Sequence, residues 1–384
     1  MRLRTVPCLL VIVLAGFLLA PVAGREEERE NKTKAIASER AKKIEKERIR
    51  NKAWLDSVRK GQAWLGQNQN RDGSWGPYPK ANVAVTSLAI LALMANGNTE
   101  GRGRYSANVR AGVTRLLHNV TTRRNATSKR PPGYIKIDKD DYSRMHGQGY
   151  ATLALALAYG AGKKDAARQA EIREKLELAV ECIEKAQDDS GGWYYTPIPT
   201  QHEGSVTVCQ IQALRAAREA GIKVRADVIE RAISYMERSF DPETGGFCYA
   251  LDDRDRHSYA LTAAALTTLY GLGEYDRRKM IRSGLEYMKR HFSRQLTGRA
   301  DWFFYGNLYA SQAMHQVANT SWGAPYWQEW WPRTRDYLVK LQRPSGAWQT
   351  IRYASSENYG PAYFTSCSLL ILTVPLGLLP TFER

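Results

Sequence analysis

Almost continuously apolar runs alternate along the chain with segments that are apolar on one face and charged on the other. The apolar runs, rich in Ala, Leu, Val and Thr, cover residues 83–97, 147–162, 205–221, 258–273, 306–319 and 363–377. A helix that is apolar on all sides is typical of a protein interior, whereas a helix with one charged face lies at the surface. The alternation therefore predicts outer and inner helices that pair as hairpins.

A short motif accompanies these hairpins. Residues 60–75 read KGQAWLGQNQNRDGSW, and degraded copies occupy residues 178–193, 231–247 and 333–348, each with Gly and an aromatic residue at its end. Two weaker copies share only the helix, and together the copies recur about every 50 residues, which is room for two helices and two short loops. The chain is therefore predicted to be a repeat protein.

Six hairpins can close into a ring, which leaves no hairpin with an uncovered face. We therefore predict an all-α fold, an α6/α6 toroid, in which residues 54–384 form a single domain. One glycine in each copy of the motif is expected to turn the chain; these are Gly73, Gly191, Gly245 and Gly346. The aromatic residue of each copy is expected to pack between hairpins, and its Gln to bond loop backbone.

The motif resembles the QW repeat of the prenyltransferase and squalene/terpene cyclase superfamily. The copies at residues 60–75 and 333–348 match that repeat best, and the resemblance covers residues 54–384. It implies a toroid whose central cavity binds an elongated apolar, isoprenoid-like molecule. Because toroids of this kind also serve other functions, it leaves the reaction, and whether there is one, open.

The N-terminus has the pattern of a secretory signal. Arg2 and Arg4 precede an apolar run from Leu9 to Ala20, and small residues follow it. We expect a signal peptide over residues 1–24, cleavage near Arg25 and export to the periplasm or the extracellular space. Contact with a membrane is expected only if the signal is not cleaved.

Composition and charge change this picture little. Residues 25–53 are dense in Glu, Lys and Arg and are interpreted as a charged leader helix or linker. The net charge of +17 fits either an anionic partner or a solubilising surface. The four cysteines after the signal are not spaced like zinc ligands. The sequence does not decide whether they form disulfides or stay as free thiols. We predict no metal, no cofactor and no nucleic-acid partner, and the sequence names no protein partner.

Polar residues gather at the beginning of the inner runs. In a toroid these positions surround the central cavity, so the side chains there are candidate ligand contacts. The candidate binding residues are His146, Gln148, His202, Glu203, His257, Tyr259, Tyr309, Gln312 and Tyr363.

One segment matches a catalytic motif of the cyclases. Residues 138–141 read DKDD, which fits the DxDD motif whose middle Asp protonates an olefin, so the resemblance makes Asp140 the candidate catalytic acid. Such an acid must stay protonated in an apolar setting, whereas residues 129–144 are rich in charge.

Two other functions fit the same fold. A secreted polysaccharide lyase or glycosidase would use carboxylates and arginines for cleavage and for binding uronate groups; the candidates are Glu203, Asp252, Asp253, Asp255, Asp301, Arg144, Arg254 and Arg256. A non-enzymatic scaffold would present its surface to a protein or an anionic wall polymer. If the protein is an enzyme, cyclase or transferase chemistry ranks first and polysaccharide cleavage second.

Overall fold

The computed structural model describes residues 52–77, 82–122, 131–137, 143–161, 165–271, 277–297, 300, 302–349, 359–377 and 379. These residues belong to one unit, Asn51–Arg384. The predicted signal peptide, most of the predicted leader and Asp140 lie outside the described residues.

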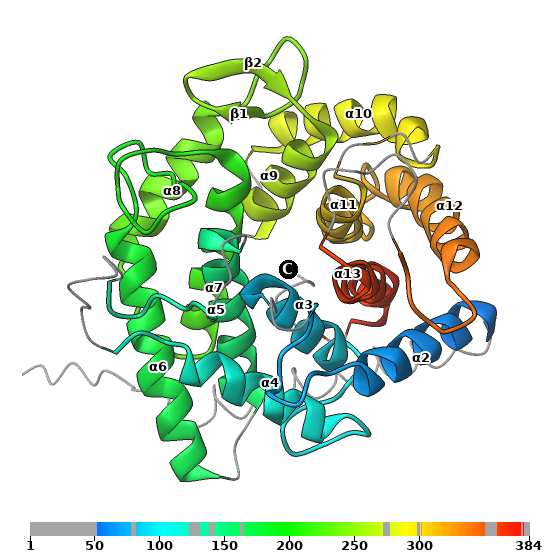
Figure 1. The fold of residues 1–384 in the computed structure, drawn as a ribbon. Helices are drawn as coiled ribbons and strands as arrows, with labels where there is room; N and C mark the ends of the chain where they lie inside the picture. The colour runs from blue at the N-terminus through cyan, green and yellow to red at the C-terminus, as the bar shows by residue number, and fades with distance from the viewer. Residues whose placement is uncertain are drawn as a thin grey trace, which may run out of the picture. The chain divides into compact units, whose positions relative to one another are not determined.

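Six inner helices form a closed ring in the described part of the chain (Figure 1). Each inner helix contacts the next one, and the last contacts the first. The inner helices are α3 (Val83–Met94), α5 (Arg144–Ala161), α7 (Gly204–Glu219), α9 (Tyr259–Gly271), α11 (Phe303–Val317) and α13 (Pro361–Thr373). They coincide with the six apolar runs, because only helices covered on every side bury apolar residues all round.

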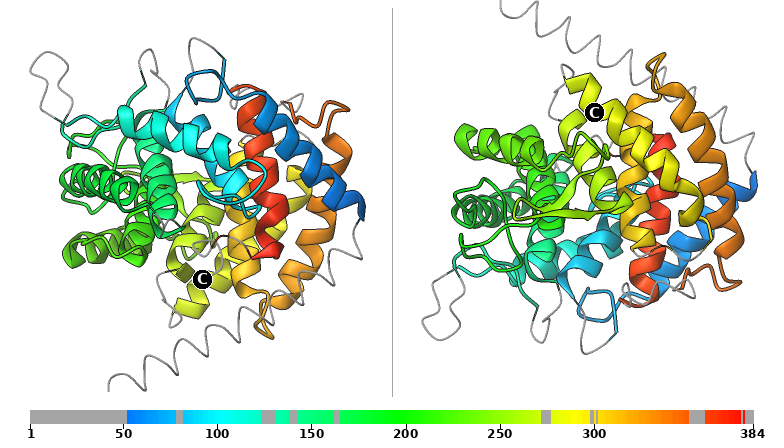
Figure 2. Two further views of the ribbon diagram at one scale, coloured as in Figure 1. Left: turned by 90° about the horizontal axis from the view of Figure 1, so that it is seen from below. Right: turned by 90° about the horizontal axis from the view of Figure 1, so that it is seen from above.

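Outer helices surround this ring, and each precedes an inner helix in the chain (Figure 1). They are α2 (Lys52–Gln67), α4 (Ser106–His118), α6 (Ala166–Lys185), α8 (Ala226–Arg238), α10 (Arg278–Gln295) and α12 (Ala324–Leu341). Figure 2 shows α2, the first described helix, beside α13, and these two helices are in contact. The predicted all-α toroid of six hairpins is confirmed.

Three shorter elements were not predicted. Strands β1 (Cys248–Ala250) and β2 (Asp253–His257) pair antiparallel between α8 and α9, and a 3₁₀ turn, η3 (Val374–Leu376), follows α13. The alternating charges of β2 lie on an exposed edge, which is why no apolar pattern marks this hairpin in the sequence. Among the described helices, none has both the length and the apolar character needed to cross a bilayer.

The repeated motif makes the same contacts in different hairpins. The indole of Trp75 is fully buried and donates to Leu65 O (2.9 Å), while its backbone N–H donates to Thr86 Oγ1 (3.1 Å). Trp193 and Trp348 donate in the same way to a residue ten positions earlier (2.7 and 2.8 Å). These bonds fasten an outer helix to the inner helix that follows it, within one hairpin. The ring edges of Trp75 and Trp348 also lie against Gly112 of α4 and Gly61 of α2, which belong to neighbouring hairpins, so the predicted packing between hairpins is confirmed.

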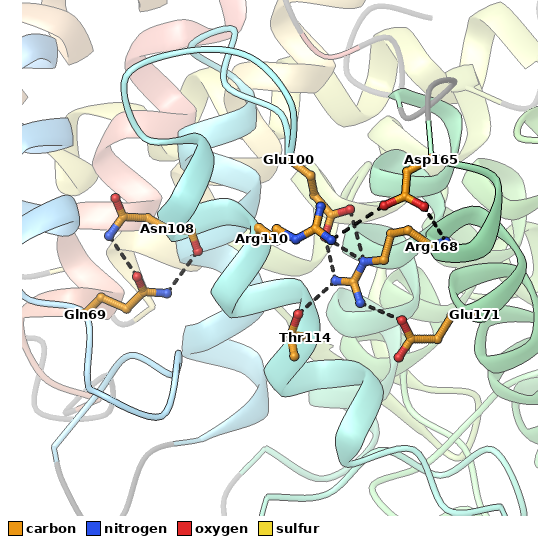
Figure 3. A network of polar contacts seen from close by, with 8 residues as sticks. All are labelled: Gln69, Glu100, Asn108, Arg110, Thr114, Asp165, Arg168 and Glu171. Carbon is orange, nitrogen blue, oxygen red and sulfur yellow. Dashed lines mark hydrogen bonds and ion pairs between the residues drawn. The ribbon is translucent and has the colours of Figure 1, made fainter.

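The glutamine of the motif joins neighbouring hairpins. Gln69 Nε2 donates to Asn108 O of α4 (2.9 Å), and a second bond runs from Asn108 Nδ2 to Gln69 Oε1 (2.8 Å; Figure 3). Gln342 donates to Ser57 O of α2 (2.8 Å), which closes the ring between its last and first hairpins. Since each Gln also bonds its own loop, the predicted backbone role is confirmed.

A buried ion-pair network joins α6 to the preceding hairpin (Figure 3). Arg168 in the first turn of α6 is 8% exposed and donates to Glu100 (2.6 Å) and Thr114 (2.9 Å). Glu171 takes another guanidinium N–H (2.8 Å). This network holds the α3–α4 loop, α4 and α6 in one place.

Candidate functional site

A cavity of about 540 Å³ opens where the inner helices begin. Every inner helix contributes a side chain to it, because the N-terminal ends of all six helices meet around the axis of the ring. One lining residue from each, in chain order, is Val85, His146, Ser205, Leu261, Tyr305 and Tyr363. A concave site of this size suits a small molecule or a segment of a polymer.

Hydrogen bonds across the ring form the floor of the cavity. Tyr150 of α5 lines the cavity, and its hydroxyl lies 3.1 Å from the hydroxyl of Tyr309 on α11. Cys209 Sγ lies 3.4 Å from the same Tyr309 oxygen. Deeper along the helices, Gln212 Nε2 donates to Gln312 Oε1 (2.9 Å). These side chains fill the centre of the ring and close the inner end of the cavity, which we call its floor.

The floor tyrosines are neutral phenols. Burial raises the pKa of Tyr150, Tyr305 and Tyr309 well above its usual value. The hydroxyl of Tyr305 donates to Ser205 O (3.2 Å). Tyr150 and Tyr305 line the cavity, and because their hydroxyls bond to other protein groups, they contribute mainly the aromatic ring to its wall.

A Glu–Ser–His cluster lies in one wall. Glu203 caps α7, where its buried carboxylate accepts from the backbone N–H groups of Ser205 (2.9 Å) and Val206 (2.6 Å). The Ser205 hydroxyl donates to this carboxylate (2.8 Å) and lies 3.0 Å from His146 Nε2. Only Ser205 and His146 reach the cavity surface; Glu203 is behind them.

Burial shifts both titratable members of this cluster toward their neutral forms. It lowers the pKa of His146 to about 4, with a further contribution from the positive charge of Arg144. It raises the pKa of Glu203 to about 7, against the lowering effect of the hydrogen bonds from Ser205 and Val206. At neutral pH His146 is therefore an uncharged imidazole.

The mouth of the cavity is aromatic and cationic. The Arg144 guanidinium carbon lies 5.5 Å from the centre of the Tyr195 ring, and that of Arg256 lies 4.0 Å from the centre of the Tyr249 ring. The two tyrosine hydroxyls are 2.8 Å apart, so both cations rest on one connected aromatic surface. Trp302, 40% exposed, completes this part of the lining.

Three of the nine predicted binding residues line the cavity: His146, His257 and Tyr363. His257 ends β2, and its Nε2 lies 3.3 Å from Asp241 Oδ2. A fourth, Glu203, contacts the lining through Ser205.

Two predicted residues at the beginnings of inner runs lie away from the cavity. Gln148 donates to Gly133 O (3.0 Å) and accepts from the backbone of Ile135 (2.9 Å), which fastens residues 131–137 to α5. His202 Nδ1 lies 3.2 Å from the Tyr235 hydroxyl on α8. A role in ligand binding stays a prediction for both.

The other three are buried and do not line the cavity. The Tyr259 hydroxyl accepts from Trp330 Nε1 (2.9 Å), behind the inner layer. Tyr309 and Gln312 belong to the floor, where they support Tyr150 and Gln212. Their contacts with the protein account for their polarity, and contact with a ligand stays a prediction.

Sequence reasoning did not select several lining residues, among them Tyr150, Ser205, Tyr195, Tyr249 and Trp302. The first two lie within the starts of inner runs, so their positions carried a signal. The others lie in connections before inner helices, where only the recurrence of aromatic residues in each connection could have indicated them.

Comparisons with known proteins identify the architecture. No family model matches the chain, and no curated protein matches its sequence. Solved structures do match. D-mannose isomerase has a TM-score of 0.61 at 11% identity, covering 85% of this chain and 97% of that protein.

Two further structures of other activities share the fold. The α-1,6-mannanase GH76A of Salegentibacter sp. HEL1_6, in complex with α-1,6-mannotriose, has a TM-score of 0.59 at 9% identity, covering 85% of this chain and all of that one. The type II terpene cyclase MstE from Scytonema, in complex with geranylgeranyl dihydroxybenzoate, has a TM-score of 0.51 at 14% identity, covering 85% and 99%. At such identities the likeness shows an α/α toroid and no particular chemistry.

Proposed function

We propose that this toroid binds an elongated apolar, isoprenoid-like molecule in the cavity at the N-terminal ends of its inner helices. The observation that carries the proposal is the aromatic floor, where the hydroxyls of Tyr150, Tyr305 and Tyr309 bond to other protein groups. Apolar side chains of α3 and α9, among them Leu88 and Leu261, complement these ring faces. Transfer of an apolar chain from water to such a surface is favourable.

Two parts of the proposal come from the sequence. The Gly–aromatic motif resembles that of the prenyltransferase and squalene/terpene cyclase superfamily, and the likeness to a terpene cyclase supports this at the level of the fold. The apolar run near the N-terminus supports export after cleavage of a signal peptide. Catalysis is not part of the proposal.

Binding of farnesol and squalene to purified residues 25–384 tests the proposal, by native mass spectrometry and by fluorescence of the cavity aromatics. We expect one molecule per chain and a loss of affinity of at least about tenfold in Ala84→Trp, because an indole at this half-buried lining position takes up part of the space that the ligand needs. Ala167→Trp, at an exposed position of α6, is the matched control. Equal affinity of Ala84→Trp and the wild type would show that the cavity is not the site.

A second candidate function is cleavage of a polysaccharide by a secreted lyase or glycosidase. The exposed face of Trp302 favours it, because an exposed aromatic ring at a cavity mouth is suited to stacking on a sugar. Among the carboxylates predicted for this function, Glu203 lies behind Ser205, Asp253 and Asp255 lie on β2, and Asp301 lies outside the described residues. Release of unsaturated or reducing sugars from a uronate polymer, with no binding of farnesol, would favour this function.

A further inference from the structure

The described lining of the cavity holds two arginines from distant parts of the chain and His257, which faces Asp241 at 3.3 Å. Arg144 is the first residue of α5, and Arg256 lies on β2, just before α9. His146 beside them is neutral at physiological pH because its pKa is about 4. The described lining therefore presents two positive charges at the mouth, above an aromatic floor.

A tyrosine ring supports each of the two guanidinium groups. Each lies over a tyrosine ring, and the hydroxyls of Tyr195 and Tyr249 are 2.8 Å apart, which connects the two supports. A guanidinium group that stacks on a ring through its face keeps the N–H groups at its edge available to acceptors. Such an edge matches the paired oxygens of a carboxylate or a phosphate.

The backbone at the mouth is strained. Arg144 and Trp302 are the non-glycine residues with positive φ in the described part of the chain (47° and 56°), and both line this cavity. The backbone N–H of Met145 donates to Tyr195 O (3.2 Å), so the strained turn is fastened to the tyrosine that supports Arg144. Strain of this kind concentrates at ligand sites, where the surrounding structure holds a side chain in a required position.

Carboxylates of the protein leave this charge largely uncompensated in the described residues. Arg256 pairs with Asp253 at 3.9 Å between two exposed side chains, and pairs of that kind contribute little. Glu203 also interacts with the charge of Arg256, which lowers the pKa of Glu203, but burial outweighs this effect and raises that pKa to about 7, so about half of this group is protonated at neutral pH. An anionic group entering the mouth would therefore meet a positive potential.

We propose that Arg144 and Arg256 bind the anionic head group, a carboxylate or a phosphate, of an amphiphile whose apolar chain lies on the aromatic floor. This inference rests on the proposed function and narrows its ligand class. The apolar chain contributes hydrophobic affinity, and the head group fixes the end of the ligand that stays at the mouth.

Three probes that share one C15 isoprenoid chain test binding of the apolar chain and binding of the anionic head group separately. Farnesol is uncharged, farnesoate carries a carboxylate, and farnesyl phosphate carries a phosphate. We expect one or both anions to bind purified residues 25–384 at least about tenfold more tightly than farnesol, with a preference that weakens as salt is added. The stronger of the two anions identifies the head group.

Variants at the mouth assign the effect to the arginines. We expect Arg144→Asn and Arg256→Gln each to lower affinity for the anion much more than affinity for farnesol, and so to remove most of the preference for the anion. Asn tolerates the left-handed backbone at position 144, so this variant retains the local fold. Arg254→Gln is the matched control, because this neighbouring guanidinium donates to Arg238 O and Phe240 O, away from the cavity lining.

The outcomes distinguish the two proposals. Equal affinity for all three probes would leave the proposed function standing and overturn this inference, as would an anion preference unaffected by both arginine variants. Failure of all three probes to bind would overturn the proposed function itself. Binding of a tetragalacturonate more tightly than any C15 probe would overturn both in favour of a uronate polymer.

Discussion

At the scale of single residues, the glycines of the motif meet two demands at once. Gly191 has a φ of 89°, and a Cβ placed on it would lie 2.2 Å from Arg231 O on the next outer helix. Gly73 and Gly346 stand in the same relation to Ala111 O and Lys60 O (2.4 and 2.5 Å). Glycine is therefore required both by the turn and by the close approach of two hairpins.

Burial shifts the pKa values of His146 and Glu203 in opposite directions: it lowers that of the imidazole and raises that of the carboxyl group. The unfolded His146 titrates near 6.5 and the folded one near 4, so between these pH values the unfolded chain binds more protons and acidification destabilises the fold. The unfolded Glu203 titrates near 4.5 and the folded one near 7, so there the folded chain binds more protons and a rise in pH destabilises it. Where the two windows overlap, the effects oppose each other.

Single variants are expected to separate these effects. Relative to the wild type, His146→Gln should lose less stability as the pH falls from 6.5 toward 4.5, and Glu203→Gln should lose less as the pH rises from 4.5 to 7. Urea unfolding across this range, with Glu230→Gln on the exposed side of α8 as control, measures both differences. An unchanged pH slope in Glu203→Gln would mean that folding does not raise the pKa of this carboxyl.

At the scale of elements, hairpins are joined by polar contacts as well as by apolar packing. The Arg168 network in Figure 3 illustrates this, because the buried guanidinium is shared by a loop, by α4 and by its own helix. A charge in such a position is stabilising only while its partners are present, and removal of one partner leaves the other buried without compensation.

Two arginines of α6 give a matched comparison. Arg168→Ala is expected to lower the free energy of unfolding by about 3 kcal/mol, because it leaves the carboxylate of Glu100 unpaired at 10% exposure. Arg173→Ala, which breaks an exposed pair with Glu177, should change the free energy of unfolding far less, because solvent screens a pair of exposed charges. Equal losses in the two variants, measured by chemical denaturation, would contradict a special role for the buried network.

At the scale of the whole molecule, ring closure makes every hairpin depend on two neighbours. The last inner helix, α13, contacts α2, α3 and α11, and nearly all of its side chains are buried. In an open solenoid a terminal repeat has one neighbour, whereas in this ring no repeat is terminal.

Removal of α13 is therefore expected to abolish cooperative unfolding. A chain of residues 52–341 would expose the apolar faces of three helices and should show neither a sharp denaturant transition nor the near-ultraviolet circular dichroism of packed aromatics. Residues 52–384, with the ring intact, serve as the control and should unfold in one step. Cooperative unfolding of the shortened chain at the midpoint of the control would refute the dependence on closure.

The sequence by itself determined the all-α class, the number of hairpins, the assignment of inner and outer helices, and the structural roles of the Gly, aromatic and Gln residues in the motif. These features follow from local rules: the helical period, the burial of all-round apolar helices, and the backbone freedom of glycine. The β1–β2 hairpin was not predicted from the sequence, because it is short and exposed and so carries no apolar pattern.

Only the tertiary structure decided which polar side chains face the cavity. His146 and Gln148 are two positions apart, about 200° around the helix, and only His146 reaches the lining. A helix that is apolar on all sides has no preferred face, so its sequence does not fix its rotation about its own axis; packing against its neighbours does. The two arginine–tyrosine contacts at the mouth, Arg144 with Tyr195 and Arg256 with Tyr249, also depend on the tertiary structure. They lie side by side only because the ring brings three distant segments of the chain together.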